Sequence, residues 1–133
     1  MSGAFLPAVY LAGFRAGADY SALTDTTKYI AVQLDTDGDV IVAAAGEQVN
    51  IGFLQNKPAD QEPAVIAGPG GGSKAIAAGT IAAGDFLKTD SSGHLLKISS
   101  ETSNAVAIAL ESAVDNDVFN VLVLAPGYSV TIA

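Results

Sequence analysis

Residues 29 to 43 read YIAVQLDTDGDVIVA, and this stretch decides the expected fold. Two apolar runs, YIAVQL (29 to 34) and DVIVA (39 to 43), flank a turn that contains Asp-Gly. β-branched and aromatic residues suit a pleated, half-buried strand, and Asp-Gly suits the tight connection of a β-hairpin. The stretch therefore predicts two antiparallel strands.

Similar short runs recur along the chain at intervals of about ten residues, a spacing typical of a small all-β sandwich or barrel. Long helical periodicity is scarce. We therefore predict an all-β fold with little helix. The further predicted strands are VNIGFL (49 to 54), PAVIA (63 to 67), DFLKT (85 to 89), HLLKI (94 to 98), AVAIAL (105 to 110), VFNVLVL (118 to 124) and YSVTI (128 to 132).

The chain also matches itself. At an offset of 55, Asp35 falls on Asp90 and Gly38 on Gly93, and at an offset of 57 residues 49 to 70 fall on residues 106 to 127. The match predicts two degenerate β repeats that share one core. We divide the chain into an N-terminal arm (1 to 18), a first β unit (19 to 70), a glycine-rich linker (71 to 74) and a second β unit (75 to 133), all within one compact domain.

The composition excludes several classes of partner. Apolar residues make up 50% of the 133 residues and charged residues only 15%, with a net charge of −8. The six basic residues lie far apart in the sequence, which argues against binding to nucleic acid or to an anionic membrane. No cysteine is present, so a thiolate metal site is impossible. A weakly charged surface favours lasting contact with other protein.

The N-terminal sequence MSGAFLPAVYLAGFRAG is apolar but contains Pro7 and is too short to span a bilayer. Its large side chains need cover, either from the core of the same chain or from a neighbouring molecule, and the sequence leaves both alternatives open. The candidate contact residues of this arm are Phe5, Leu6, Val9, Tyr10, Leu11 and Phe14.

The stretch IAGPGGGSKAIAAG (66 to 79) raises the question of a phosphate-binding loop. The P-loop pattern fails at Ser73 and Ala75, which stand where glycine and a hydroxyl are needed. A dinucleotide-type spacing would require a following helix, which Gly79 and Gly84 disfavour. We therefore expect a linker at this stretch and no bound cofactor.

Other candidate chemistry is equally weak. Asp35, Asp37 and Asp39 have the first three spacings of a calcium loop, but a hairpin turn explains them as well; weak cation binding there remains the alternative. His94 is the only histidine and adjoins a turn glycine, without a serine in a nucleophile-elbow setting. The scattered carboxylates suggest no catalytic pair. We predict no catalytic, cofactor or metal residues, and thus no enzyme.

One region resembles a known family. Residues 82 to 130 contain Ala83-Gly84-Asp85-Phe86-Leu87, a turn at Gly93, the strand Val106-Ala107-Ile108-Ala109 and the apolar run 118 to 123. This order of small, apolar and turn residues resembles that of the capsid decoration (head cement) proteins of tailed phages. The family's usual glycine in the third of these motifs is Ala107 here, with Gly52 at a nearby position of the first unit.

The resemblance implies a β-rich virion protein without cofactor. Such a protein forms a homotrimer and binds the major capsid protein on the outside of an icosahedral phage head, at capsomer junctions, where it stabilises the shell. The alternative is a glycan- or receptor-binding β module of a phage tail or bacterial surface. Such a module would show exposed aromatic side chains near polar groups.

Overall fold

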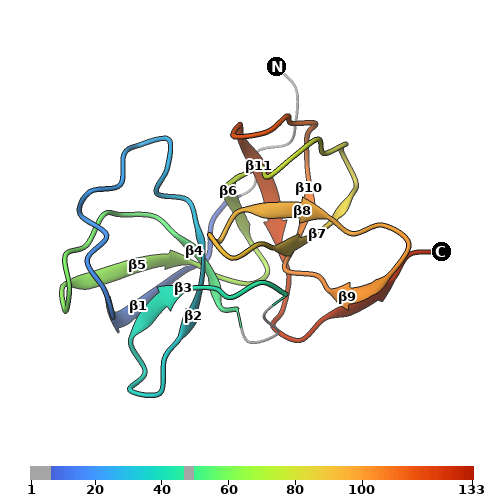
Figure 1. The fold of residues 1–133 in the computed structure, drawn as a ribbon. Coiled ribbons are helices and arrows are strands. Elements are labelled where there is room, and N and C mark those ends of the chain that lie inside the picture. The colour runs from blue at the N-terminus through green and yellow to red at the C-terminus, as the bar shows by residue number, and fades with distance from the viewer. Residues whose placement is uncertain (1–6, 47–49) are drawn as a thin grey trace.

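The structure is a computed structural model that describes residues 7 to 46 and 50 to 133. Two five-stranded sheets, in which every pairing is antiparallel, lie side by side (Figure 1). The first sheet has the order β1-β5-β4-β2-β3 and the second β6-β11-β10-β7-β8. The first consists of β1 (Tyr10–Arg15), β2 (Ala31–Leu34), β3 (Val40–Val42), β4 (Gly52–Leu54) and β5 (Pro63–Ala67), and the second of β6 (Gly72–Ile76), β7 (Phe86–Thr89), β8 (Leu95–Lys97), β10 (Ala107–Ala109) and β11 (Val118–Val123).

A separate two-stranded ribbon joins β9 (Thr102–Asn104) to β12 (Ser129–Thr131) beside the C-terminus (Figure 1). The described residues contain no helix, so none of them forms a helix that could cross a membrane. The all-β prediction is thus confirmed, in the form of a small sandwich-like domain that does not close into a barrel.

All nine predicted apolar runs contain strands. The prediction missed three strands, namely β1, β6 and β9. GSKAI and TSN are rich in glycine, alanine and small polar residues that have no strong strand preference, whereas YLAGFR contains large apolar side chains and was predicted as part of the arm. These segments become strands because a partner strand pairs with their backbone, which the sequence pattern does not reveal.

The two sheets repeat one strand order at a constant offset. Strands β2, β3, β4 and β5 begin 55 residues before β7, β8, β10 and β11, respectively. Smaller features follow the same offset, since Gln61 and Asn116 both have positive φ angles, 68° and 69°. The strands of the later segment are therefore also related by an offset of 55, and the offset of 57 predicted from the sequence is wrong. Its identities in alanine- and valine-rich sequence did not reflect strand pairing, and Pro69-Gly70 is not equivalent to Pro126-Gly127.

The ends of the expected units also differ from the structure. Residues 71 to 74, expected as a linker, contain the start of β6, which pairs with β11 along its whole length. Residues 10 to 15 of the expected arm form β1, the edge strand of the first sheet. Each of the two segments supplies backbone that completes a sheet.

Two hydrophobic clusters hold the sheets together. The first cluster lies on one face of the first sheet and includes Val32, Leu54 and Ile66, together with Ile76 from β6. The second cluster is centred on the second sheet and also contains Phe53 from β4, which is fully buried. Because each sheet contributes side chains to the other's cluster, the two halves form one body.

Candidate functional site

The backbone of the glycine-rich stretch (66 to 79) forms hydrogen bonds with other parts of the chain. Its N–H groups at Gly68, Gly70 and Gly72 donate hydrogen bonds to the carbonyl oxygens of Val9, Val123 and Pro7, respectively, over 2.7 to 3.0 Å. A phosphate would need such N–H groups to be free and to point at it. This stretch therefore offers no phosphate cradle at those three positions.

Close approach explains why glycine stands here. A Cβ at Gly71 would lie 2.7 Å from the Val9 nitrogen and 2.8 Å from the Pro7 oxygen, and one at Gly68 would meet the Leu11 side chain. The glycines thus let the segment before β1 lie directly against the stretch between β5 and β6. This close packing accounts for the glycines at positions 68 and 71.

The acidic turn is likewise occupied by hydrogen bonds. Asp35 Oδ1 accepts from the backbone N–H groups of Asp37 and Asp39, each at 2.9 Å. The Asp39 carboxylate lies 3.6 Å from Arg15 and accepts a 3.0 Å hydrogen bond from Gln61 Nε2. No group of three or more possible metal ligands exists among the described residues. The side chains here organise a hairpin turn, as Asp90 does at the equivalent turn of the second sheet.

The arm candidates separate into three groups. Phe5 and Leu6 lie outside the described residues. Leu11 and Phe14 are half-buried and pack against the first cluster, as the intramolecular alternative expects. Val9 and Tyr10 are exposed, with 64% of Tyr10 accessible. Only these last two of the described candidates present a large apolar surface to a neighbour.

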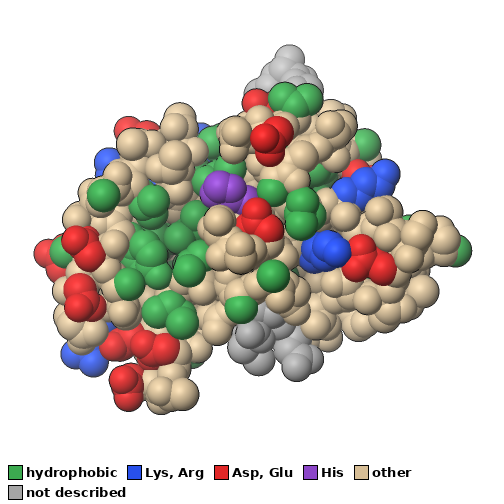
Figure 2. Space-filling view, viewed as in Figure 1, with side chains coloured by type: hydrophobic (Ala, Val, Ile, Leu, Met, Phe, Trp, Pro, Cys, Tyr) green, Lys and Arg blue, Asp and Glu red, His purple; other side chains and the backbone are tan. Residues whose placement is uncertain are grey.

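His94 lies in the region between the two halves of the molecule, on the face shown in Figure 2. Its backbone N–H donates to Asp90 Oδ1 at 2.9 Å, which ties it to the turn before β8. On the same face, hydrophobic side chains gather over the first sheet (Figure 2). This histidine is thus part of a hairpin, as its sequence position suggested.

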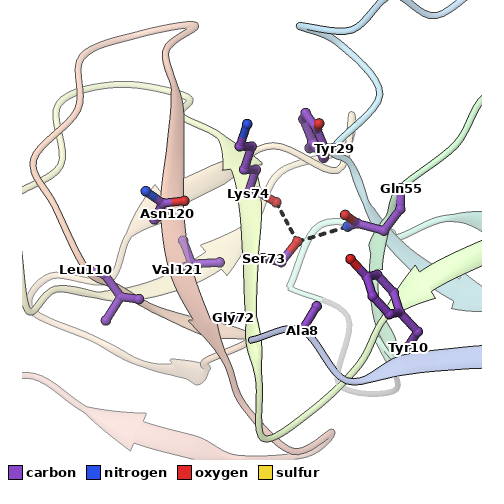
Figure 3. A pocket seen from close by; sticks show the side chains of 10 residues that line it. All are labelled: Ala8, Tyr10, Tyr29, Gln55, Gly72, Ser73, Lys74, Leu110, Asn120 and Val121. Carbon is purple, nitrogen blue, oxygen red and sulfur yellow. Dashed lines mark hydrogen bonds between the residues drawn. The ribbon is translucent and has the colours of Figure 1, made fainter. Parts of the chain in front are cut away.

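A polar hollow of about 230 Å³ lies between the two sheets (Figure 3). Aromatic rings, side-chain amides and one ammonium group converge on it from both halves of the chain. Among the described lining residues, only Lys74 carries a charge. It is lined by Ala8, Tyr10, Tyr29, Gln55, Gly72, Ser73, Lys74, Leu110, Asn120 and Val121.

Hydrogen bonds fix the orientation of both amides. Gln55 Nε2 donates to the Phe53 carbonyl and to Ser73 Oγ, both at 3.0 Å. Asn120 Nδ2 donates to Glu111 Oε2 at 2.8 Å, and the Asn120 backbone N–H donates to the same oxygen. Since a carbonyl and a carboxylate can only accept, the amide nitrogens are identified and the oxygens face away from these partners.

The loop between β1 and β2 brings Asp25, Lys28 and Tyr29 to the site. Lys28 Nζ and Lys74 Nζ lie 5.2 and 5.7 Å from the centre of the Tyr29 ring, within the range of cation–π attraction. Lys57 and Lys28 pair with Asp25 at 3.3 and 3.6 Å. The hydrogen bond and charge of Lys57, with a smaller effect of Lys28, lower the pKa of Asp25.

Lys28 and Lys74, far apart in sequence, therefore both lie at the Tyr29 ring, and Lys57 pairs with Asp25 of the same loop. Asp25, Lys74 and Glu111 also line a second hollow of about 300 Å³ beside the first. Tyr20 anchors the loop, because its hydroxyl accepts a 2.8 Å hydrogen bond from the Val42 N–H, and burial raises the pKa of that hydroxyl. Sequence reasoning missed this site, and only pairing of distant strands brings its residues together.

Comparison of the chain with protein-family models and with curated proteins finds no match.

Proposed function

We propose that this chain is a structural protein of a tailed-phage virion that binds the outside of the icosahedral head at capsomer junctions and stabilises the shell. The supporting observation is the position of the family-like motifs on the strands. Ala83 to Leu87 lead into β7, Gly93 lies in the turn before β8, and the next two motifs overlap β10 and β11. One continuous pattern thus runs through four strands of one sheet.

The motif residues have structural roles that suit such a protein. Gly84 has a φ of +90° and donates its N–H to the Ala109 carbonyl, while Asp85 Oδ2 accepts from the Ala82 N–H. Together they join the start of β7 to the end of β10. In this proposal the chain descends from a duplicated β unit and has no catalytic role.

The proposed partners are the major capsid protein and further copies of the same chain, as a homotrimer. Val9 and Tyr10 support this assignment, because they expose apolar surface at an edge strand, where backbone and side chains can contact another chain. Many identical contacts over a shell stabilise it through avidity and mass action.

The test is co-sedimentation with expanded phage heads that lack decoration protein, with light scattering to measure the oligomeric state. The wild type should pellet with heads and raise the temperature at which they open. Removing residues 1 to 18 would delete β1, so point variants are better. Val9→Ser/Tyr10→Ser should lose binding, whereas Val114→Ser, which changes an exposed valine of the other half, should retain it. A wild-type monomer that stays in the supernatant would contradict the proposal.

The alternative, a glycan- or receptor-binding module, gains support from the hollow of Figure 3. The sequence offered few signs of aromatic side chains beside polar groups, but Tyr10 and Tyr29 line this hollow with two amides. Binding of a soluble saccharide by a protein that ignores phage heads would favour this second function.

A further inference from the structure

We infer that the hollow between the two sheets binds a saccharide that carries a carboxylate, such as a uronic acid. The inference deepens the second candidate function by naming the ligand. It does not require binding to a phage head; Tyr10 belongs to both proposed surfaces, so its ring can contact a sugar or a neighbouring chain but not both at once.

The charge of the hollow points to an anionic ligand. Lys74 is its only charged lining residue, and no carboxylate lies within ion-pair distance of it among the described residues. The Tyr29 ring attracts the Lys74 ammonium but leaves its charge uncompensated. The nearby Asp25 carboxylate is paired with Lys57 and Lys28. Lys74 is thus an ammonium without an ion-pair partner among the described residues, and the carboxylate of a ligand can supply one. Glu111, which lines the adjoining hollow together with Lys74, is hydrogen-bonded to Asn120.

The neutral groups point to a ligand with several hydroxyls. Gln55 Oε1 and Asn120 Oδ1 accept no hydrogen bond from the described residues, because both amides face their protein partners with the nitrogen. Amide oxygens accept hydrogen bonds from hydroxyl donors. Sugars supply such donors at close spacing, whereas a simple carboxylic acid does not.

The aromatic rings and the volume of the hollow also fit a sugar ligand. Tyr10, from β1, and Tyr29, from the loop before β2, stand on one side of the hollow in Figure 3. An aromatic face packs well against the apolar C–H face of a sugar ring while the phenol hydroxyl stays polar. A hollow of about 230 Å³ lies below the usual size of drug-binding pockets and suits a single sugar residue. The lining offers only one base, which favours a monovalent carboxylate over a phosphate dianion.

The experiment titrates the whole protein with glucuronate, glucose and acetate and follows backbone amide shifts by NMR. Glucuronate should bind with a millimolar dissociation constant and shift the amides of Ser73, Lys74 and Asn120. Glucose should bind about tenfold more weakly, since it lacks the charge-assisted contact, and acetate more weakly still.

Two variants separate the two parts of the site. Lys74→Gln should reduce the affinity for glucuronate about tenfold, to that for glucose, and Lys74→Arg should restore most of it. Tyr10→Ala should weaken both sugars alike, because it removes the stacking surface. Both side chains are exposed, so these changes leave the core intact. Lys97→Gln, at an exposed lysine of β8, is the matched control and should bind as the wild type does.

The inference is overturned if glucuronate causes no saturable shift up to about 50 mM, a range that covers millimolar binding. It is also overturned if Lys74→Gln binds glucuronate as tightly as Lys97→Gln does, or if the shifts lie elsewhere on the surface. Head binding is measured separately by co-sedimentation of Lys74→Gln. Loss of saccharide binding with normal head binding would leave the shell proposal intact and assign the hollow to the saccharide.

Discussion

Gly52 is a residue whose position in the sheet excludes any side chain. It has a φ of +147°, and a Cβ there would overlap the Ala67 carbonyl oxygen of the neighbouring strand. The equivalent position in the second sheet is Ala107, whose φ is not in the positive range. The sequence marked both residues only through the family resemblance. The backbone approach that requires glycine at one of them is visible only in the paired strands.

Gly52→Ala should therefore destabilise the protein by about 3 kcal/mol or more, because backbone strain adds to a steric overlap with a neighbouring strand. Urea unfolding followed by far-UV circular dichroism measures the loss. Gly38→Asn is the matched control, since Gly38 also has a positive φ, 81°, but has open space around its Cβ position. That variant should cost less than about 1 kcal/mol. Equal losses in the two variants would contradict the role of close approach.

The β9/β12 ribbon forms its own two-stranded sheet, apart from the two five-stranded sheets. Lys88 on β7 lies 2.8 Å from Glu101, the residue before β9, and the Phe86 and Tyr128 rings stack with centroids 6.2 Å apart. The hydrogen bond from Lys88 is the main cause that lowers the pKa of Glu101. The ribbon is therefore held partly by an ion pair that depends on pH.

A lowered pKa in the folded state means that the ionised Glu101 stabilises the ribbon at pH values above its pKa in the unfolded chain. This contribution is lost as the pH falls through the folded value. Glu101→Gln should therefore speed hydrogen exchange of the β9 and β12 amides a few-fold at pH 7, and acid should add little more. NMR protection factors measure the effect, with amides of β10 and β11 as the internal control. Unchanged hydrogen exchange of the β9 and β12 amides in Glu101→Gln at pH 7 would contradict a stabilising role of the Lys88–Glu101 ion pair.

Individual strands could be predicted from the sequence where the apolar runs are long. Residues 29 to 43 form the predicted hairpin of β2 and β3, and PAVIA (63 to 67) is β5 with the predicted bounds. By contrast, GSKAI (72 to 76) reads as a loop because glycine and serine open it. It forms β6 because β11, one of the most apolar runs in the chain, pairs with it. Pairing of this kind decides strands that propensity alone leaves undefined.

At the scale of the whole molecule, Phe53 joins the two halves. It lies in β4 of the first sheet, yet its fully buried ring belongs to the cluster of the second. Ile76 makes the reciprocal contribution from β6 to the first cluster. Two sheets that share side chains in this way should fold and unfold as one unit.

Phe53→Ala should lower the free energy of unfolding by about 3 to 5 kcal/mol, the usual cost of removing a buried aromatic ring. The unfolding curve should remain a single transition. Hydrogen exchange under mild denaturant should show β10 and β11 losing protection together with β4 and β5. Tyr20→Phe, which changes only the first half, serves as the comparison. A second sheet that keeps its full protection in Phe53→Ala would mean that the halves fold independently.

The sequence by itself determined the all-β class, most strand positions and the two hairpin turns, because alternation, turn chemistry and β-branched runs act over a few residues. Only the tertiary structure decided the offset of 55 between the halves, the strand role of the glycine-rich stretch and the approach of Lys28 and Lys74 to the Tyr29 ring. These features depend on which distant strands pair and how closely their backbones approach. A small-residue sequence such as GPGGGS permits many such partners, and packing against Pro7 and Val9 selects one.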